Sequence, residues 1–292
     1  MDEMENYSGH DTIADINYLP ATGKIIETSA WKKRYLQERD QFTRAMKIRD
    51  IRGMGHKFQL DLNGFEFVQI PTKQRSTDDD EVIIKDYYPE LENIIRKMTG
   101  ASTVFAFNHA IRQASDPSEE GKPDNNGRLQ QIPASHPHVD YAAIDTDSGI
   151  RELIEGTKKE ITFPPHISKL YDTCSRFCFL NVWRPLKTIK KDPLAVADAT
   201  TVPDSDYQVR ARKFRSGIKS ANYVMSHGNK DEQHRWYYMY EMQPDEIVIF
   251  KGYDTKQDFP GWRCPHTAFV LPGTENSPPR ESIECRIVCF WE

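Results

Sequence analysis

Four short apolar segments in the second half of the chain constrain the fold most. They are rich in β-branched and aromatic residues and are separated by Pro, Gly and Asp: RFCFLNVWRPL (176–186), DEIVIFKGY (245–253), HTAFVL (266–271) and SIECRIVCFW (282–291). Segments of this length and composition are typical of strands that pack in a β core. The chain after residue 176 is therefore expected to be built mainly from strands.

The first part of the chain is expected to hold a helix and a few short strands. Residues 14–19 (ADINYL) have strand character, and Ser29 is placed to cap a helix over 31–51, where apolar residues recur at near-helical spacing. The segment 58–70 is expected to form two short strands around the Asn-Gly pair at 63–64. Asn-Gly between apolar runs is a strong hairpin signal.

Two further helices and a strand are expected before residue 176. Residues 88–98 form an amphipathic pattern, with Gly100 placed to end the helix, and 102–112 resemble a strand. A short helix is expected over 150–160, and the polar, Gly/Pro-rich stretch 115–128 is expected to be a surface loop.

This order of elements predicts a mainly β protein with flanking α elements. We expect a double-stranded β-helix core (jelly-roll, cupin-like) decorated by N-terminal helices. A chain of 292 residues is within the size that β barrels and sandwiches reach as one unit. We therefore expect one domain over 1–292, with the decoration in 1–98 and the core in 99–292.

Composition excludes several other classes of protein. Hydrophobic residues make up 38% and charged residues 28%, which indicates a globular chain, and the net charge of −5 leaves no basic stripe for nucleic acid. The five cysteines form no CxxC pair, which favours buried thiols in a reducing compartment. The acidic, polar start and the lack of an apolar run of membrane-spanning length predict a cytoplasmic protein with no membrane partner.

The segment SHPHVDY (135–141) carries two candidate metal ligands. In an extended segment, side chains two positions apart point to the same side, so His138 and Asp140 project together while Val139 points away. One imidazole and one carboxylate supply two of the three ligands in the facial triad of non-haem iron(II) oxygenases. The pattern is short and common, so it needs a third ligand.

His266 supplies the third ligand, and a later motif suits an anionic co-substrate. His266 begins an apolar segment, and Arg280 and Ser282 follow in an RxS arrangement in which both side chains share one side. A guanidinium offers a carboxylate two parallel charge-assisted hydrogen bonds, and a hydroxyl adds a third donor. Arg286 has the same strand parity. The ordered set predicts iron(II) with 2-oxoglutarate as co-substrate and O₂ as oxidant.

The chemistry of this donor set is consistent with that interpretation. Two neutral imidazoles and a carboxylate leave three open positions on iron(II), enough for the 2-oxo acid end of 2-oxoglutarate and for O₂. A zinc hydrolase with the same ligands also needs a general base, and nothing in the sequence nominates one. No catalytic residue beyond the metal ligands is nominated.

Seven segments together resemble a known family of enzymes. They are TGASTVFAFNHAIR (99–112), HPHVDY (136–141), NVWRPL (181–186), DPLAVADA (192–199), HRWYYMYEMQPDEIVIFKGYD (234–254), CPHTAF (264–269) and RESIECR (280–286). The chain resembles the Fe(II)/2-oxoglutarate-dependent oxygenases of the gibberellin desaturase and cephalosporin methoxylase-related family. The resemblance implies a double-stranded β-helix and oxidation of a small molecule, often in secondary metabolism. It also implies metal ligation by His138, Asp140 and His266 and co-substrate binding by Arg280.

Further residues are expected around the co-substrate. Asn181 and Arg184 are polar residues on a predicted core strand, where a polar side chain must be hydrogen-bonded or functional. We expect Asn181 to donate to a chelating oxygen of 2-oxoglutarate, and Tyr141 to contact the co-substrate. Arg184 is expected to pair either with a substrate carboxylate or with Asp198 or Asp245 in a structural ion pair.

Other candidates for substrate contact come from two aromatic or basic segments. Trp236 and Tyr238 in HRWYYM could wall a pocket, although aromatic residues in a β core are more often packing residues. His109 and Arg112 precede the metal motif on a predicted strand. The substrate is expected to be a small molecule, with a carboxylate if Arg184 faces it.

Two alternative functions remain open on the sequence alone. One is an iron oxidase of the same fold that takes all electrons from its substrate and uses no 2-oxoglutarate. Arg280 and Ser282 argue against it. The other is a non-catalytic, cupin-like binding protein, which the loss of a ligand would favour. For the main hypothesis, hydroxylation, desaturation and oxidative cyclisation stay open, because they differ in how the substrate is placed.

Overall fold

A computed structural model describes most of the chain. The described residues are 9–21, 26–27, 41–54, 57–73, 79–113, 118, 120–123, 130–142, 163–213, 219–228 and 233–292. The helix predicted for 150–160, and residues 31–40 of the helix predicted for 31–51, lie outside these ranges.

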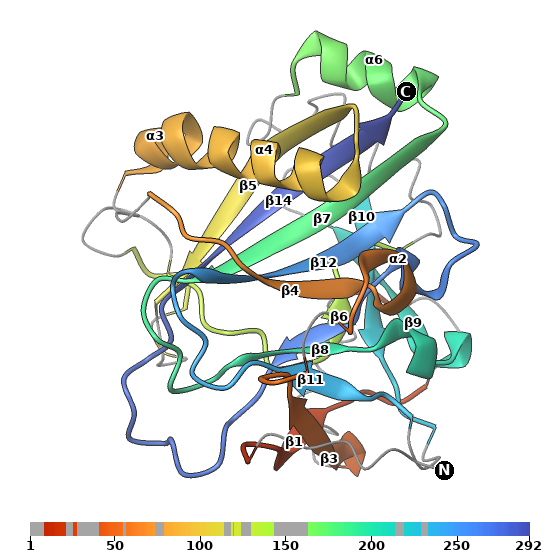
Figure 1. Ribbon diagram of the computed structural model, residues 1–292. Coiled ribbons are helices and arrows are strands. Elements are labelled where there is room, and N and C mark those ends of the chain that lie inside the picture. The colour runs from red at the N-terminus through yellow and green to blue at the C-terminus, as the bar shows by residue number, and fades with distance from the viewer. Residues whose placement is uncertain are drawn as a thin grey trace.

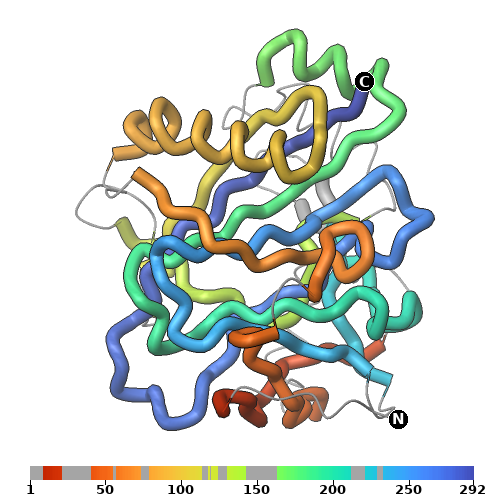
Figure 2. Tube along the Cα trace, viewed as in Figure 1, coloured from red at the N-terminus to blue at the C-terminus, as the bar shows by residue number. Residues whose placement is uncertain are grey.

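Two curved sheets form the core (Figure 1). The five-stranded sheet has the order β4 (Phe65–Gln69), β12 (Glu246–Asp254), β7 (Arg176–Pro185), β14 (Ser282–Trp291), β5 (Thr103–Arg112). The nine-stranded sheet has the order β1 (Thr12–Asn17), β3 (Thr43–Asp50), β11 (Trp236–Tyr238), β8 (Leu194–Ala197), β13 (His266–Ala268), β6 (His138–Val139), β10 (Lys219–Met225), β9 (Tyr207–Lys213), β2 (Ile26–Glu27). Segments far apart in the sequence lie side by side, as β4 and β12 show (Figure 2).

Helices cover one face of the five-stranded sheet. They are α3 (Asp80–Val82), the π-helix η1 (Ile83–Tyr87) and α4 (Tyr88–Thr99), which lie across the sheet in Figure 1. The other helices of the described residues are α2 (Leu60–Asn63), α6 (Pro165–Thr173) and the short 3₁₀ helices η3 (Ala199–Thr201), η4 (Asp204–Asp206) and η5 (Pro260–Trp262). Leu91 and Ile95 of α4 pack with Leu180 and Val182 of β7. No helix among the described residues is long and apolar enough to cross a bilayer.

The inner face of the five-stranded sheet turns toward the nine-stranded sheet. On β7, Leu180 and Val182 pack under the helices, whereas Trp183 packs in a cluster with Val196 and Tyr237 from the other sheet. This alternation follows from the two-residue period of a strand. The double-stranded β-helix that the sequence predicted is confirmed, as are helix 88–98 and the strands from 176 onward.

Two local predictions are wrong. Residues 43–50 are a strand, β3, and not the end of a helix, because they pair with β1 on one side and with β11 on the other. Backbone pairing in the sheet overrides a weak helical pattern. Residues 60–63 form the short helix α2 and not a strand. Gly64, with φ of 86°, caps that helix, so the Asn-Gly pair ends a helix where a hairpin turn was expected.

A β-bulge in β5 changes which side chains face inward. Arg286 pairs with Asn108 but Ile287 pairs with Ala106, so Phe107 is an extra residue in β5. Before the bulge, Ala106 packs under the helices; without the extra residue, the even-numbered positions that follow would do the same. The bulge turns Asn108 and Arg112 toward the inner face instead, and leaves His109 on the helix side.

Close contact between α2 and η5 gives a stability prediction. A Cβ on Gly261 would lie 2.5 Å from the carbonyl oxygen of Leu60 and 2.7 Å from that of Asp61. We expect Gly261→Ala to lower the free energy of unfolding by about 2 kcal/mol, because backbone must move to admit the methyl group. Gly9→Ala is the control, because a Cβ there meets nothing within 4 Å. Equal thermal melting of the two variants would contradict this packing.

Candidate functional site

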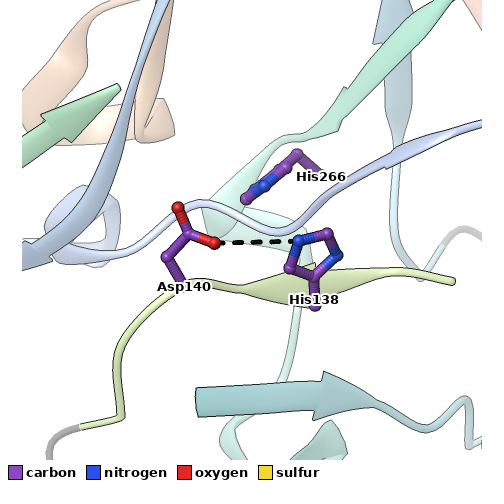
Figure 3. A group of neighbouring side chains, drawn as sticks. All are labelled: His138, Asp140 and His266. Atoms are coloured by element: carbon purple, nitrogen blue, oxygen red, sulfur yellow. Dashed lines mark ion pairs between the residues drawn. The ribbon is translucent and has the colours of Figure 1, made fainter. Parts of the chain in front are cut away.

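Three side chains converge at the centre of the nine-stranded sheet (Figure 3). His138 and His266 pair directly across β6 and β13, and their ring centroids are 4.3 Å apart. Asp140 follows β6, and its Oδ1 lies 3.7 Å from Nε2 of His138. One ligand atom from each residue lies within 4.8 Å of the others, so the three residues form a group that can hold a metal ion.

Backbone carbonyl groups orient both imidazoles. Nδ1 of His138 lies 2.9 Å from the carbonyl oxygen of His136, and Nδ1 of His266 lies 3.2 Å from that of Cys264. Because a carbonyl oxygen only accepts, each Nδ1 carries the proton and each Nε2 keeps its lone pair for a metal. Outer contacts of this kind fix the ring orientation of metal-ligating histidines.

Electrostatics also prepare the three groups for a cation. Burial lowers the pKa of His138 well below its ordinary value, and His266 and His136 lower it further, so the ring is neutral. Burial acts to raise the pKa of Asp140, but Arg286, His266 and His138 outweigh it and hold the pKa well below its usual range. A metal ion therefore meets a neutral imidazole at His138 and an anionic carboxylate at Asp140, the forms in which these groups bind metals.

Asn181 and Arg286 contact the metal-binding carboxylate. Asn181 donates from Nδ2 to Oδ2 of Asp140 at 2.7 Å, and Nε of Arg286 lies 3.7 Å from the same oxygen. Both residues were predicted to bind 2-oxoglutarate. In the structure both side chains contact Oδ2 of Asp140, which leaves Oδ1 facing His138, and their contact with 2-oxoglutarate stays a prediction. Arg286 is held in turn by Asn108 at 2.7 Å and Glu284 at 2.9 Å.

A cavity beside the triad is lined by basic and polar groups. Its lining includes His138, Asp140, His266, Trp183, Arg112, Arg280, Glu284 and Arg286. Nε of Arg280 and Oγ of Ser282 are buried without a hydrogen-bond partner among the described residues. Arg280 donates from Nη1 to the carbonyl oxygen of Asp192 at 2.8 Å. These two buried donors lie two residues apart on the same side of the chain, and a bound carboxylate would accept hydrogen bonds from both.

Tyr141 packs in an aromatic cluster next to Asp140. Its ring centroid lies 4.9 Å from that of Phe179, and a Cβ on Gly252 would come within 3.0 Å of its ring. Phe107 and Phe163 belong to the same cluster. Tyr141 therefore lies beside the triad, with its ring packed against other aromatic side chains.

Four predicted substrate contacts lie away from the cavity. Arg184 faces the helices, where it donates to the hydroxyl of Tyr87 and the carbonyl oxygens of Ile70 and Pro244. These bonds take the place of the ion pair predicted with Asp198 or Asp245, and the pairing with a substrate carboxylate stays a prediction. Asn181 and Arg184 are three residues apart, and an odd separation places them on opposite faces.

The other three also lie outside the lining of the cavity. His109 lies on the helix side of β5, with Tyr88 at 2.9 Å and Asp80 at 3.1 Å. Trp236 and Tyr238 pack with Val139 on the face of the nine-stranded sheet opposite His138. Trp236 donates to the hydroxyl of Tyr18, and these aromatic residues are packing residues.

The sequence prediction missed Glu284, which lines the cavity, and Asn108, which holds the cavity residue Arg286. Glu284 shares the strand parity of Arg280, Ser282 and Arg286, so alternation along β14 could have found it. Asn108 has no such signal, because the bulge in β5 that turns it inward depends on pairing with β14.

Comparisons with known proteins show the family to which the chain belongs. A family model described as "Oxidoreductase/YMDC permease-like domain" matches residues 16–290. The hydroxylase/desaturase efuI of Hormonema carpetanum is 34% identical over 86% of this chain and 84% of its own length. The alpha-ketoglutarate-dependent dioxygenase phiK of a fungal species is 32% identical over 85% of this chain and 84% of its own length.

A solved structure shows the same fold. The iron and alpha-ketoglutarate-dependent endoperoxidase NvfI superposes with a TM-score of 0.75 at 22% identity, over 97% of this chain and 99% of its own. The fold and the triad define a non-haem iron oxygenase of the double-stranded β-helix type. The chain belongs to the family of Fe(II)/2-oxoglutarate-dependent oxygenases that contains these fungal hydroxylases and desaturases. Iron, 2-oxoglutarate and O₂ are therefore its cofactor and co-substrates.

The contact of Asn181 with Asp140 gives a metal-binding prediction. We expect Asn181→Ala to weaken anaerobic Fe(II) binding about 10–100-fold, because the carboxylate loses the hydrogen bond that orients it. Asn63→Ala is a matched control, since Asn63 is also buried and donates to a carboxylate, that of Asp198 at 3.0 Å, away from the triad. The contact would have no role in metal binding if the two variants bound Fe(II) equally well.

Proposed function

We propose that His138, Asp140 and His266 hold Fe(II) and that the enzyme hydroxylates, desaturates or oxidatively cyclises a small molecule of secondary metabolism. The observation that carries this proposal is the convergence of two Nε2 atoms and one carboxylate within 4.8 Å. Bound iron supplies the oxidising chemistry with 2-oxoglutarate and O₂, while the protein positions the reactants and shields them from water.

The co-substrate's far carboxylate is proposed to bind at Arg280 and Ser282. Both side chains are buried, face the inner side of the sheet and hold donors without partners among the described residues. When 2-oxoglutarate is held there by its far carboxylate, its 2-oxo acid end is free to reach the metal. The oxidase alternative offers no ligand for these two donors, and a binding protein without catalysis offers no reason for a complete triad.

The substrate proposal is broader than the one made from the sequence. The expectation of a substrate carboxylate rested on Arg184, which faces the helices. The relatives are named as hydroxylases, desaturases and a gibberellin cluster GA4 desaturase, which supports a small organic substrate. The aromatic cluster that contains Tyr141, the residue after Asp140, together with Phe107 and Phe179 supports an apolar body for that substrate.

Two proposals about the whole chain accompany this function. Strands from residues 12–69 enter both sheets, which supports one domain over 1–292. All five cysteines are free, including buried Cys178 and Cys289, which face each other on β7 and β14. Two neighbouring thiols that are not joined in a disulfide support the proposal that the enzyme resides in the reducing cytoplasm.

Succinate release tests the function directly. We expect the Fe(II)-loaded enzyme with 2-oxoglutarate and O₂ to release succinate slowly, and faster with a true substrate. Asp140→Ala removes the anionic ligand and is expected to lower succinate release at least 100-fold, measured by chromatography. Asn63→Ala should retain it. Undiminished succinate release by Asp140→Ala would refute the proposed ligand set.

Arg280 gives a prediction about stability. Burial lowers the pKa of Arg280 to about 9, with Arg112 as a further cause, so the folded protein holds this charge at a cost in free energy. We expect Arg280→Met to abolish 2-oxoglutarate binding and to raise the stability of the metal-free protein by about 1 kcal/mol, because a buried charge is replaced by an apolar group. A lower melting temperature for the variant would show that Arg280 stabilises the fold.

A further inference from the structure

We infer that Arg112 is a second arginine in the pocket for the far carboxylate of 2-oxoglutarate, where it lies with Arg280 and Ser282. This inference rests on the proposed function and concerns a residue on a different strand from the RxS motif. It also replaces the role first expected for Arg112, which was contact with the substrate.

Strand register places Arg112 beside the proposed carboxylate site. Ser282 of β14 pairs directly with Arg112 of β5. Side chains of directly paired residues lie on the same face, with Cβ atoms about 5 Å apart. Arg280 and Arg112 both line the cavity beside the triad. Arg112 and Arg280 therefore line the cavity together, and Ser282 lies on the same face of the sheet directly beside Arg112.

The bulge in β5 is the reason that Arg112 faces inward. Val104 and Ala106 pack under the helices, and an unbroken strand would place 108, 110 and 112 on that side as well. The extra residue at Phe107 reverses the order, so that Asn108 reaches Arg286 and Arg112 reaches the cavity. Bulges that re-aim a side chain are common next to active sites.

The charges in this corner favour an anionic ligand. Arg112 and Arg280 are close enough for Arg112 to disfavour the charge of Arg280. The two carboxylates that line the cavity have other partners: Glu284 accepts from Arg286, and Asp140 accepts from Asn181. The buried guanidinium of Arg280 and the half-buried one of Arg112 thus carry like charge beside one cavity, and a carboxylate between them would form charge-assisted hydrogen bonds with both.

A purely structural role for Arg112 predicts a different result. Arg112 donates from Nη1 to the carbonyl oxygen of Ile132 at 2.9 Å, and residues 130–137 lead into β6. If that bond were its whole function, its loss would disturb His138 and would weaken the binding of the metal and of every 2-oxo acid alike. If Arg112 recognises the far carboxylate, its loss weakens the binding only of those 2-oxo acids that carry a far carboxylate.

Two 2-oxo acids separate these roles. Pyruvate has the 2-oxo acid end of 2-oxoglutarate and lacks the far carboxylate. Both acids are titrated anaerobically into the Fe(II)-loaded enzyme, and dissociation constants are taken from the change in visible absorption. The variants are Arg112→Gln, which removes the charge, and Arg112→Lys, which keeps the charge and loses the two-pronged geometry. His109→Gln is the control, because His109 lies on the same strand and faces the helices.

We expect Arg112→Gln to weaken 2-oxoglutarate binding at least tenfold, about 1.4 kcal/mol, and to change pyruvate binding less than twofold. Arg112→Lys should fall between Arg112→Gln and the unmodified enzyme, and His109→Gln should match the unmodified enzyme. Equal weakening of both acids, or no weakening of either, would overturn the inference. If the unmodified enzyme binds no 2-oxoglutarate, or if Arg280→Met binds it as tightly, the proposed function itself fails.

Discussion

The direct pairing of His138 with His266 across β6 and β13 is the contact on which the site depends. A shift of one residue in this register would turn His138 away and place Val139 toward the other sheet. Val139 is fully buried in an apolar cluster with Trp236 and Tyr238 on the far face, so burial of these side chains opposes the shift. The metal ligands are thus positioned by apolar packing on the opposite side of the same strands.

The five-stranded sheet supplies the charged half of the site. Paired positions on β7 and β14 bring Asn181 and Arg286 together at Oδ2 of Asp140, while Ser282 begins β14 and Arg280 lies just before it. Arg280 is almost completely buried with an unpartnered Nε among the described residues. Such a group reduces stability in the absence of a ligand, and a bound anion removes that penalty. The cavity therefore favours a bound dicarboxylate, and the protein without this ligand is less stable as a result.

Strand periodicity allowed much of this site to be predicted from sequence. It placed His138 with Asp140 and Arg280 with Ser282, because β6 and the start of β14 follow a regular two-residue alternation. The same rule, applied to Asn181 and Arg184, would have excluded Arg184. Arg112 and Asn108 could not be placed, because an extra residue in β5 reverses the alternation and is visible only in the pairing with β14. The strand at 43–50 was missed because partners distant in sequence decide its conformation.

A crystal structure of the enzyme, grown without oxygen in the presence of Fe(II) and 2-oxoglutarate, tests the account most directly. We expect a metal ion bound by Nε2 of His138, Oδ1 of Asp140 and Nε2 of His266, with the far carboxylate of 2-oxoglutarate at Arg280 and Ser282. A metal ion bound by both oxygens of Asp140 would contradict the orienting role of Asn181. A co-substrate whose far carboxylate lies away from Arg280 would contradict the central claim.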